Sequence, residues 1–386
     1  MRFSGFDDEW KTYKLKDLLH NKSSSISINQ LDDNVGNYPL YGASGFLKCI
    51  DFYEMDSDYI SIVKDGSGVG NISFHEKNTS VVNTSQYILP KENLNIHFIF
   101  YLLQTINLNK YKTGSTIPHI YFKDYSIEKV KIPKYDEQKK IGILLKNLDA
   151  KIEILDNKLQ MCQNFKKYLM QQIFTQKLRF ADCTGEWNLF KLGDIVELMR
   201  NGCSENQVSF ETEFPVTRIE TISKGILNFD KVGYVEKIDS SYLLQYGDIL
   251  LSNINSLKYI GNCVFFDEDK PLYHGMNLML MRFKDDFNKK YLFYYMKFYQ
   301  QWFQKMACQA VNQASINQSS LKKFPFYIPP TIDEQNKIVN VIDDTEHKIN
   351  SIEDQIIKME EFKKGLLQQM FVVQLILSLL QNKKHI

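Results

Sequence analysis

The sequence predicts an α/β (α+β) fold in two tandem copies, each copy a globular domain followed by a long helix. Three observations predict it: both ends of one unit recur along the chain, an apolar heptad pattern follows each domain, and short strand-like runs with one helical segment fill each domain. We expect the two helices to form an antiparallel coiled coil with pseudo-twofold symmetry.

The N-terminal end of the unit returns 177 residues further along the chain. MRFSGFDDEWKTYKLKDLL at residues 1–19 matches LRFADCTGEWNLFKLGDIV at residues 178–196, so Arg2 aligns with Arg179 and Trp10 with Trp187. A repeat of this density indicates duplication of one structural unit.

The C-terminal end of the unit returns at a larger offset, 197 residues. IPKYDEQ and IPPTIDEQ precede the two helices, and FKKYLMQQIF at 165–174 matches FKKGLLQQMF at 362–371. The second copy is therefore about 20 residues longer between its ends. Repeated ends around a divergent middle indicate a fixed frame that holds a changeable module.

Apolar residues in steps of four and three predict the two coiled-coil helices. The heptad positions are Ile141, Leu145, Leu148, Ile152, Leu155, Leu159 and Cys162 in the first copy, and Ile338, Ile342, Thr345, Ile349, Ile352, Ile356 and Met359 in the second. Neither stretch contains proline. We place the domains at 1–133 and 178–329, the helical spacers at 134–177 and 330–375, and a C-terminal tail at 376–386.

Four phenylalanines, Phe165, Phe174, Phe362 and Phe371, lie among lysines and glutamines at the ends of the helices. A coil of two helices cannot cover every apolar side chain. We therefore expect part of this surface to receive helices of another protein.

Each domain reads as a mixed α/β module. In the first, strand-like runs at 59–63, 80–82 and 86–89 precede a helical segment at 96–106. In the second, comparable runs at 248–252 and 279–283 precede a helix near 290–306.

Polar loops carry the candidate binding residues. KDGSGVGN at 64–71 lacks the spacing of a nucleotide-binding glycine loop, and KTGSTIPHI at 112–120 corresponds to QAVNQASIN at 309–317. Asn, Gln, Ser and Lys side chains suit contacts to adenine and to phosphates, although any one of them can equally be an ordinary solvated residue. The candidates are Lys64, Ser67, Asn71, Lys112, Ser115, Thr116, His119, Arg218, Asn253, Asn255, Lys258, His274, Asn277, Asn312 and Gln313.

Composition restricts the class of protein. The 386 residues carry a formal net charge of +1, and 44% of them are hydrophobic, which excludes a disordered chain and gives no overall basic excess. The six cysteines show no metal-binding spacing, so we expect no metal and no disulfide framework. The start of the chain is polar, and the apolar run at 371–380 is too short to cross a membrane. We expect a cytoplasmic protein with reduced thiols.

Catalytic motifs are missing from the sequence. The histidines show no HExxH spacing, and there is no Walker A loop, methyltransferase tetrad, nucleophile elbow or nuclease cluster. We expect no enzyme activity from this chain alone.

Together the IP…DEQ segment, the heptad helix, LLQQMF and LRF…EW…KLGD resemble the specificity subunit of type I restriction-modification systems. The resemblance covers about residues 1–371 and occurs twice, as that family requires. It implies two target recognition domains that each read one half of a bipartite DNA site, held apart by the helices. It also implies two methyltransferase (modification) subunits docked on the helices and restriction subunits in the full complex. S-adenosylmethionine, ATP and magnesium would belong to those partners, and this chain would hold no cofactor.

One segment departs from the family pattern, because the chain continues after LLQQMF as VVQLILSLLQNKKHI. Two other interpretations stay open. A coiled-coil scaffold or adaptor would keep the helices but bind no specific DNA, and an enzyme would need motifs that the sequence does not contain.

Overall fold

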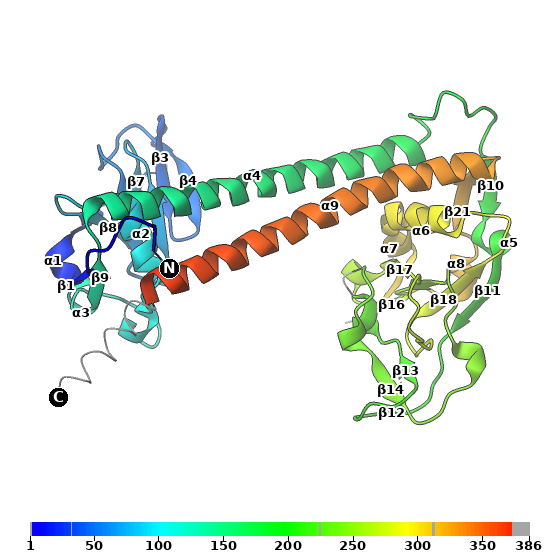
Figure 1. Cartoon of the computed structure of the whole chain (residues 1–386). Helices are drawn as coiled ribbons and strands as arrows, with labels where there is room; N and C mark the ends of the chain where they lie inside the picture. Colours follow the sequence, from blue (N-terminus) through cyan, green and yellow to red (C-terminus); the bar gives the residue numbers. More distant parts are fainter. Residues whose placement is uncertain (1, 32, 224, 311–312, 373–386) are drawn as a thin grey trace. The chain divides into compact units, whose positions relative to one another are not determined.

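The computed structural model describes residues 2–31, 33–223, 225–310 and 313–372, with backbone only at 309, 310, 313 and 372. The chain forms two compact units: Met1–Lys158 with Ile352–Ile386, and Leu159–Ser351. The two long helices, α4 (Tyr135–Phe174) and α9 (Ile332–Leu367), each contribute to both units (Figure 1). The predicted C-terminal tail, 376–386, lies outside the described residues.

The domain of the first unit precedes α4. Its elements are β1 (Lys11–Lys14), α1 (Leu15–Leu18), β2 (Leu19–Ser23), η1 (Ile28–Gln30), β3 (Tyr38–Gly42), β4 (Gly45–Ile50), β5 (Tyr59–Val63), β6 (Ile72–His75), β7 (Ser80–Val81), β8 (Ser85–Pro90), α2 (Ile96–Gln104), η2 (Leu108–Tyr111), α3 (Phe122–Tyr125) and β9 (Lys129–Ile132).

The domain of the second unit lies between α4 and α9. Its elements are β10 (Asn188–Lys191), α5 (Leu192–Ile195), β11 (Val196–Asn201), β12 (Gln207–Val208), β13 (Pro215–Val216), η3 (Ile219–Ile222), η4 (Phe229–Lys231), β14 (Gly233–Val235), η5 (Ser240–Tyr242), β15 (Ile249–Leu251), β16 (Ile254–Asn255), η6 (Leu257–Tyr259), β17 (Cys263–Phe265), β18 (Met279–Phe283), α6 (Lys289–Phe298), α7 (Gln300–Met306), β19 (Cys308–Ala310), β20 (Gln313–Ser315), α8 (Gln318–Leu321) and β21 (Pro325–Ile328). One π-helical turn, η7 (Gln368–Val372), follows α9.

The two domains share a framework that extends beyond the repeated sequence. A two-stranded sheet joins the first and last strands of each domain, β1 with β9 and β10 with β21. A four-stranded antiparallel sheet has the order β2-β8-β5-β6 in the first domain and β11-β18-β15-β17 in the second. The domains differ in their small sheets, β4-β3-β7 in one and β12-β14-β13 with β16-β20-β19 in the other. The divergent middle is therefore only partly a different structure.

Each domain packs against the start of one long helix and the end of the other. In the first unit, Ile141 and Leu145 of α4 share a core with Leu366 of α9 and Phe371 of η7. In the second unit, Ile173 and Phe174 at the end of α4 share a core with Ile338 and Ile342 near the start of α9. The two helices thus run antiparallel in both units, and the predicted coiled coil is confirmed.

The heptad positions explain this packing, because all of them are buried or half-buried. Among the described residues, an ion pair crosses between the helices in each unit: Lys363 to Asp149 (2.5 Å) and Lys166 to Glu346. A tyrosine hydroxyl of the domain donates to each of these carboxylates, from Tyr101 (2.6 Å) and from Tyr294 (2.8 Å). The same three-part contact therefore joins both helices to both domains.

The repeated arginine and the repeated DEQ motif form a second shared contact. Arg2 binds Glu137 through two nitrogens (2.9 and 2.7 Å), and Arg179 binds Glu334 in the same way (3.0 and 2.9 Å). Both carboxylates are buried, and the two-point geometry raises the pKa of each arginine through that hydrogen bonding. We call this pair of contacts the arginine latch, because it fastens the segment before each domain to the helix after it.

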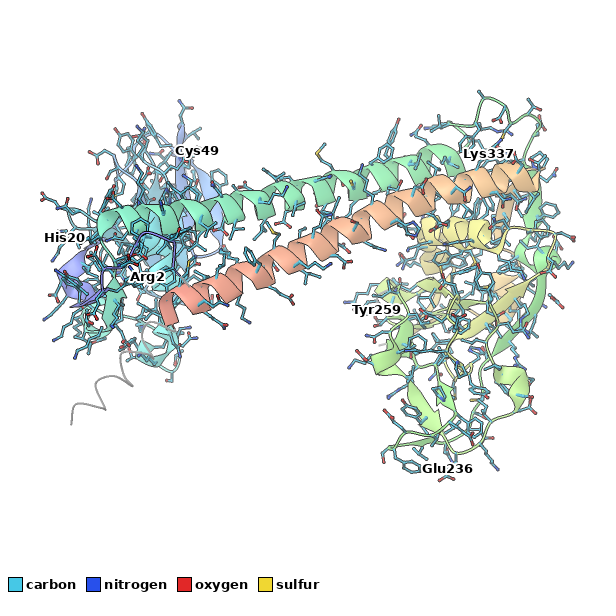
Figure 2. All side chains as sticks on the ribbon, viewed as in Figure 1. Arg2, His20, Cys49, Glu236, Tyr259 and Lys337 are labelled. Atoms are coloured by element: carbon cyan, nitrogen blue, oxygen red, sulfur yellow. The ribbon has the colours of Figure 1, made fainter. Side chains whose placement is uncertain are left out.

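The glutamine beside each of these glutamates binds the residue that caps α2 or α6. Gln138 accepts from the backbone N–H of Asn95 (3.0 Å) and donates to the carbonyl of Pro133 (2.9 Å). Gln335 repeats both contacts with Asn288 (2.9 Å) and Pro329 (3.2 Å). Asn95 and Asn288 in turn cap α2 and α6. In the second unit Lys337 also donates to Asp182 (2.7 Å), which ties the segment after α4 to α9 (Figure 2).

The helix predicted near 290–306 is interrupted in the structure. α6 ends at Phe298, and the chain turns at Tyr299 before α7 begins. The turn allows Gln300 and Phe303 to lie against Gly261, where a β-carbon would come within 3.0 Å of both side chains. None of the helices in the described part of the chain combines the length and apolar composition that crossing a bilayer requires.

Candidate nucleic-acid interface

In each domain the structure joins two polar loops that lie far apart in sequence. One loop follows the third strand of the four-stranded sheet in spatial order, β5 or β15, and the other precedes α3 or α8. The backbone N–H of Ile120 donates to the backbone carbonyl of Lys64 (2.9 Å), and the N–H of Ile316 donates to the backbone carbonyl of Asn253 (2.8 Å). We call the two joined loops of a domain its loop pair.

The first loop pair is joined at three points. The N–H of Gly66 donates to the carbonyl of Pro118 (3.0 Å), and Asp65 accepts from Nδ1 of His119 (2.7 Å). Gly66 has φ +90°, a left-handed conformation that favours glycine. Backbone bonds between Thr113 and His119 (2.9 and 2.8 Å) close the second loop into a tight hairpin.

His119 presents a free ring nitrogen at this surface. Because a carboxylate only accepts hydrogen bonds, Nδ1 of His119 is the donor to Asp65, and Nε2 remains available to another group. The side chains of His119 and Lys64 are about one third exposed (36% and 27%), and Asp65 also forms an ion pair with Lys64 (3.6 Å). The loop pair therefore offers two cationic or hydrogen-bonding side chains held by one carboxylate.

The exposed rim of the first loop pair contains the other candidates of this domain. Ser67, Asn71, Lys112, Ser115 and Thr116 are all exposed. Lys112 lies beside the glycine loop. Its Cε is so close to Gly70 that a β-carbon added to this glycine would lie 3.6 Å away. The structure thus brings all seven sequence candidates of this domain onto one loop pair.

The second loop pair is built from different contacts. β16 pairs with β20, with Ile254 opposite Ser315 and Asn255 opposite Ala314. Nδ2 of Asn255 donates to Oγ of Ser252 (3.1 Å), so this side chain is half-buried and partly engaged. Lys258 is exposed, and its Nζ lies 4.5 Å from the ring centre of Tyr259. Tyr259 is a further candidate that the sequence analysis missed, although an aromatic residue next to a loop lysine is a usable signal.

Two candidates of the second domain are wrong as surface contacts. Asn253 is 3% exposed and donates to the carbonyl of Ile316 (3.3 Å), so it joins the two loops from inside. His274 is fully buried, and burial lowers its pKa to about 4. Both lie in polar sequence, but the backbone around them is covered by other loops.

Arg218 and Asn277 lie in other loops of this domain. Arg218 is exposed at the start of η3 and forms an ion pair with Glu220 (3.6 Å). Asn277 is exposed at a turn with φ +71°. Asn312 and the side chain of Gln313 lie outside the described residues. Glu236, beside the small sheet, marks the end of this domain away from α9 (Figure 2).

Two of the phenylalanines predicted as partner surface are core residues. Phe174 is 2% exposed, with ring centres of Tyr295 and Phe298 at 5.4 and 5.5 Å, and Phe371 is 5% exposed against Trp10 and Phe98. Phe165 and Phe362, by contrast, are 55% and 54% exposed. The repeated FKK…F segment therefore contains one outward and one inward phenylalanine.

The described residues contain no group of three or more histidine, cysteine or acidic side chains that could hold a metal ion. The closest arrangement to a nucleophile and base is Ser61 with His75, whose Oγ and Nε2 are 2.9 Å apart. Both side chains are buried in the sheet, and burial lowers the pKa of His75 to about 4. This pair fills the domain core.

The chain is similar to known proteins over most of its length. The family model described as "Type I restriction modification DNA specificity domain" matches residues 7–162 and 184–361. A putative type I restriction enzyme specificity subunit (MjaX) of Methanocaldococcus jannaschii is 38% identical over 205 residues, which cover 51% of this chain and 48% of that protein. The match therefore spans about half the length of this relative.

A second relative and a solved structure match nearly end to end. A putative type I restriction enzyme specificity subunit of Haemophilus influenzae is 25% identical over 369 residues, 90% of each chain. The crystal structure of a type I restriction-modification S subunit from M. genitalium superposes with a TM-score of 0.68 at 15% identity and covers 96% of this chain and 97% of that one. This second likeness concerns the fold.

Proposed function

Because the chain belongs to the family of type I restriction-modification DNA specificity subunits, we propose that it is the non-catalytic subunit that recognises DNA in such a complex. Each domain reads one half of a bipartite, asymmetric site in double-stranded DNA. The observation that carries this proposal is the pair of unlike loop pairs on one shared framework: Lys64, Lys112 and His119 in one, Asn255, Lys258 and Tyr259 in the other. Different side chains on equivalent supports suit two different half-sites.

The long helices hold the two reading domains apart and dock two methyltransferase subunits. An apolar strip on α4 supports this docking: Met161, Phe165 and Tyr168 are exposed at positions one helical turn apart. Phe362 offers a similar, smaller contact on α9. Exposed aromatic and methionine side chains are typical of the centre of a protein–protein interface.

Catalysis and its cofactors belong to the partners in this proposal. S-adenosylmethionine binds the methyltransferase subunits, and ATP with magnesium serves the restriction subunits. The chain works in the cytoplasm, where its DNA is accessible.

The test is co-expression with a candidate methyltransferase subunit, followed by mapping of methylated adenines across the host genome. The expected result is a single bipartite, asymmetric motif with a fixed spacer. A stable complex that methylates no defined motif would contradict DNA reading. The coiled-coil scaffold would then be the better description of the protein.

A further inference from the structure

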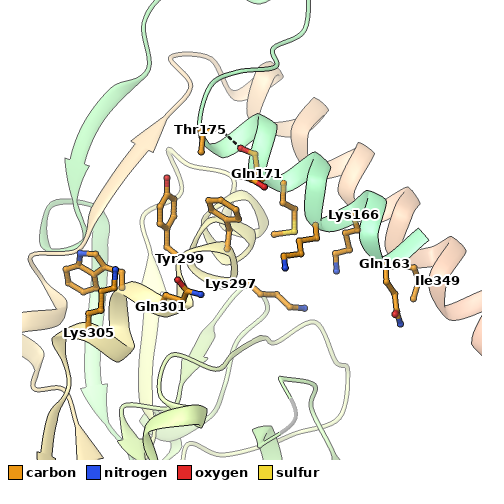
Figure 3. A pocket seen from close by; sticks show the side chains of 13 residues that line it. Gln163, Lys166, Gln171, Thr175, Lys297, Tyr299, Gln301, Lys305 and Ile349 are labelled. Atoms are coloured by element: carbon orange, nitrogen blue, oxygen red, sulfur yellow. Dashed lines mark hydrogen bonds between the residues drawn. The ribbon is translucent and has the colours of Figure 1, made fainter. Parts of the chain in front are cut away.

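A hollow of about 870 Å³ lies in the second unit, between the last turns of α4 and the helices α6 and α7 (Figure 3). Four lysines line it: Lys166 and Lys167 from α4, Lys297 from α6 and Lys305 from α7. Glutamine, threonine and apolar side chains complete the lining, and no acidic side chain belongs to it. The hollow is therefore strongly basic, although the whole chain is nearly neutral.

Only part of this positive charge is neutralised within the protein. Glu346 of α9 forms ion pairs with Lys166 and with Lys297 (3.5 Å). Burial alone would raise the pKa of Glu346, but these two lysines hold it below the ordinary value. Lys167 is exposed, as is Lys305, and neither forms an ion pair with another described residue. At least two lysines are thus free to bind an anion.

The basic hollow and the apolar strip occupy different sides of α4. On α4 the hollow uses Gln163, Lys166, Lys167, Met170, Gln171 and Thr175, whereas the strip uses Met161, Phe165 and Tyr168. At 3.6 residues per turn Gln163, Lys167 and Met170 face nearly opposite to the strip, while Gln171 and Thr175 lie closer to it. A protein partner that docks on the apolar strip therefore leaves the side of Lys167 open.

The helix α7 connects the hollow with the second loop pair. Gln304 donates to the carbonyl of Lys258 (3.2 Å), and Gln300 donates to that of Ile260 (3.1 Å). The next residue after each of these, Gln301 and Lys305, lines the hollow. The same short helix thus contacts the loop of Lys258 and lines the hollow.

We propose that the basic hollow binds the phosphate backbone of the DNA duplex beside the half-site read by the second domain. This inference rests on the proposed function and adds a contact that carries no sequence information. Lysine, glutamine and threonine side chains are typical phosphate contacts, which position a protein on DNA without reading bases. The two units differ at this position. Nine residues after its capping asparagine, Asn95, the first unit has Gln104, whereas the second unit has Lys297 nine residues after Asn288. We therefore expect this phosphate contact at the second half-site and not at the first.

The test compares the wild-type complex with K167Q/K305Q. Equilibrium binding is measured from 50 to 300 mM salt with two duplexes of equal length, one with the methylated motif and one unrelated. Two lost phosphate contacts should lower the slope of log K against log salt by about 1.8 and weaken both duplexes by a common factor of about 10 near 0.15 M salt. The ratio of the two affinities should stay unchanged.

The matched control is K177Q/K323Q, which removes two exposed lysines that line neither the hollow nor a loop pair. It should leave the slope unchanged. The inference is overturned if K167Q/K305Q keeps the wild-type slope. If this variant also loses its methyltransferase subunits at an unchanged slope, the hollow binds an acidic protein segment and not DNA. If the wild type shows no preference between the duplexes, the proposed function fails, while the slope on the unrelated duplex still decides the inference.

Discussion

His274 and Asn253 show how a single polar residue can mislead when its exposure is unknown. Both lie in polar sequence, yet neither reaches the surface. Nε2 of His274 donates to the carbonyl of Arg200 (3.3 Å), and its Nδ1 is buried without a hydrogen-bond partner. A histidine in this position is stable only while it is neutral.

The burial of His274 predicts an acid-sensitive second unit. Burial lowers the folded-state pKa to about 4, whereas an unfolded histidine titrates near 6.5. Below pH 6.5 the unfolded chain gains a proton that the folded chain does not accept, so stability is lost as pH falls from about 6.5 to about 4. By pH 5 this one histidine should cost about 2 kcal/mol of the free energy of unfolding.

Urea unfolding at pH 7 and pH 5, followed by tryptophan fluorescence, checks this value. Trp187 and Trp302 report on the same unit. His274→Gln should lower stability at pH 7 but lose about 2 kcal/mol less than the wild type on acidification. The exposed His20→Gln (Figure 2) serves as the control and should retain the wild-type pH dependence. Equal losses in His274→Gln and the wild type would contradict the assignment.

Glu137 and Glu334 bind residues from distant parts of the sequence, which the repeated motif alone does not reveal. Each is buried and is paired with an arginine from more than 130 residues earlier. In the second unit, Nε1 of Trp187 also donates to Glu334 (3.1 Å), whereas Nε1 of Trp10 has no partner. The duplication therefore preserved the latch but not every hydrogen bond around it.

The long helices are the elements that the sequence predicts best. Heptad spacing, the absence of proline and the preceding Ile-Pro pairs predict both helices and their antiparallel packing. The same spacing cannot distinguish Phe165 from Phe174, because their exposure depends on the domain that follows. Phe174 lies against α6, which is formed more than 110 residues later in the chain.

The two phenylalanines of this one segment should respond differently to truncation. Phe174→Ala empties a filled site among Tyr291, Tyr295 and Phe298 and should cost about 3–5 kcal/mol of unfolding free energy. Phe165→Ala removes an exposed ring and should change stability by less than about 0.5 kcal/mol. It should instead weaken binding of the methyltransferase subunit.

Urea unfolding and subunit titration of both variants separate the two roles. A strongly destabilised Phe165→Ala would show that this ring packs within the chain. Unchanged subunit affinity would remove Phe165 from the proposed docking strip.

At the scale of the whole molecule, the ends of each unit could be predicted and the middle could not. The edge strand β2 (LHNKS) has one buried residue out of five, so no alternating apolar pattern reveals it or its place beside β8. The strands β12, β13 and β16 have two residues each, too few for any period. The equal strand order of the two four-stranded sheets is therefore visible only in the structure.

The candidate site follows the same division. Every first-domain candidate chosen from loop composition lies on the loop pair, because glycines and short polar side chains mark tight loops. Asp65, which holds His119, was not among these candidates. It could not predict that the loop at 64–71 meets the loop at 112–120, since their contact depends on backbone bonds between residues more than 50 positions apart. The basic hollow was missed because its lysines come from three separate helices.

The framework makes a final prediction about exchange of one domain. Residues 20–130 contain the first loop pair, whereas Arg2, Glu137 and Gln138 lie outside this segment and keep the latch. Replacing 20–130 with the corresponding segment of another specificity subunit should alter one half of the methylated motif and preserve the other half and the spacer.

The donor segment should retain Asn95, whose backbone N–H donates to Gln138, and Tyr101, which donates to Asp149, or their equivalents. Methylome mapping of the exchanged protein provides the readout, with the parent chain as control. If both halves change, the domains do not read DNA independently; if only the spacer changes, residues 20–130 set the separation and not the sequence.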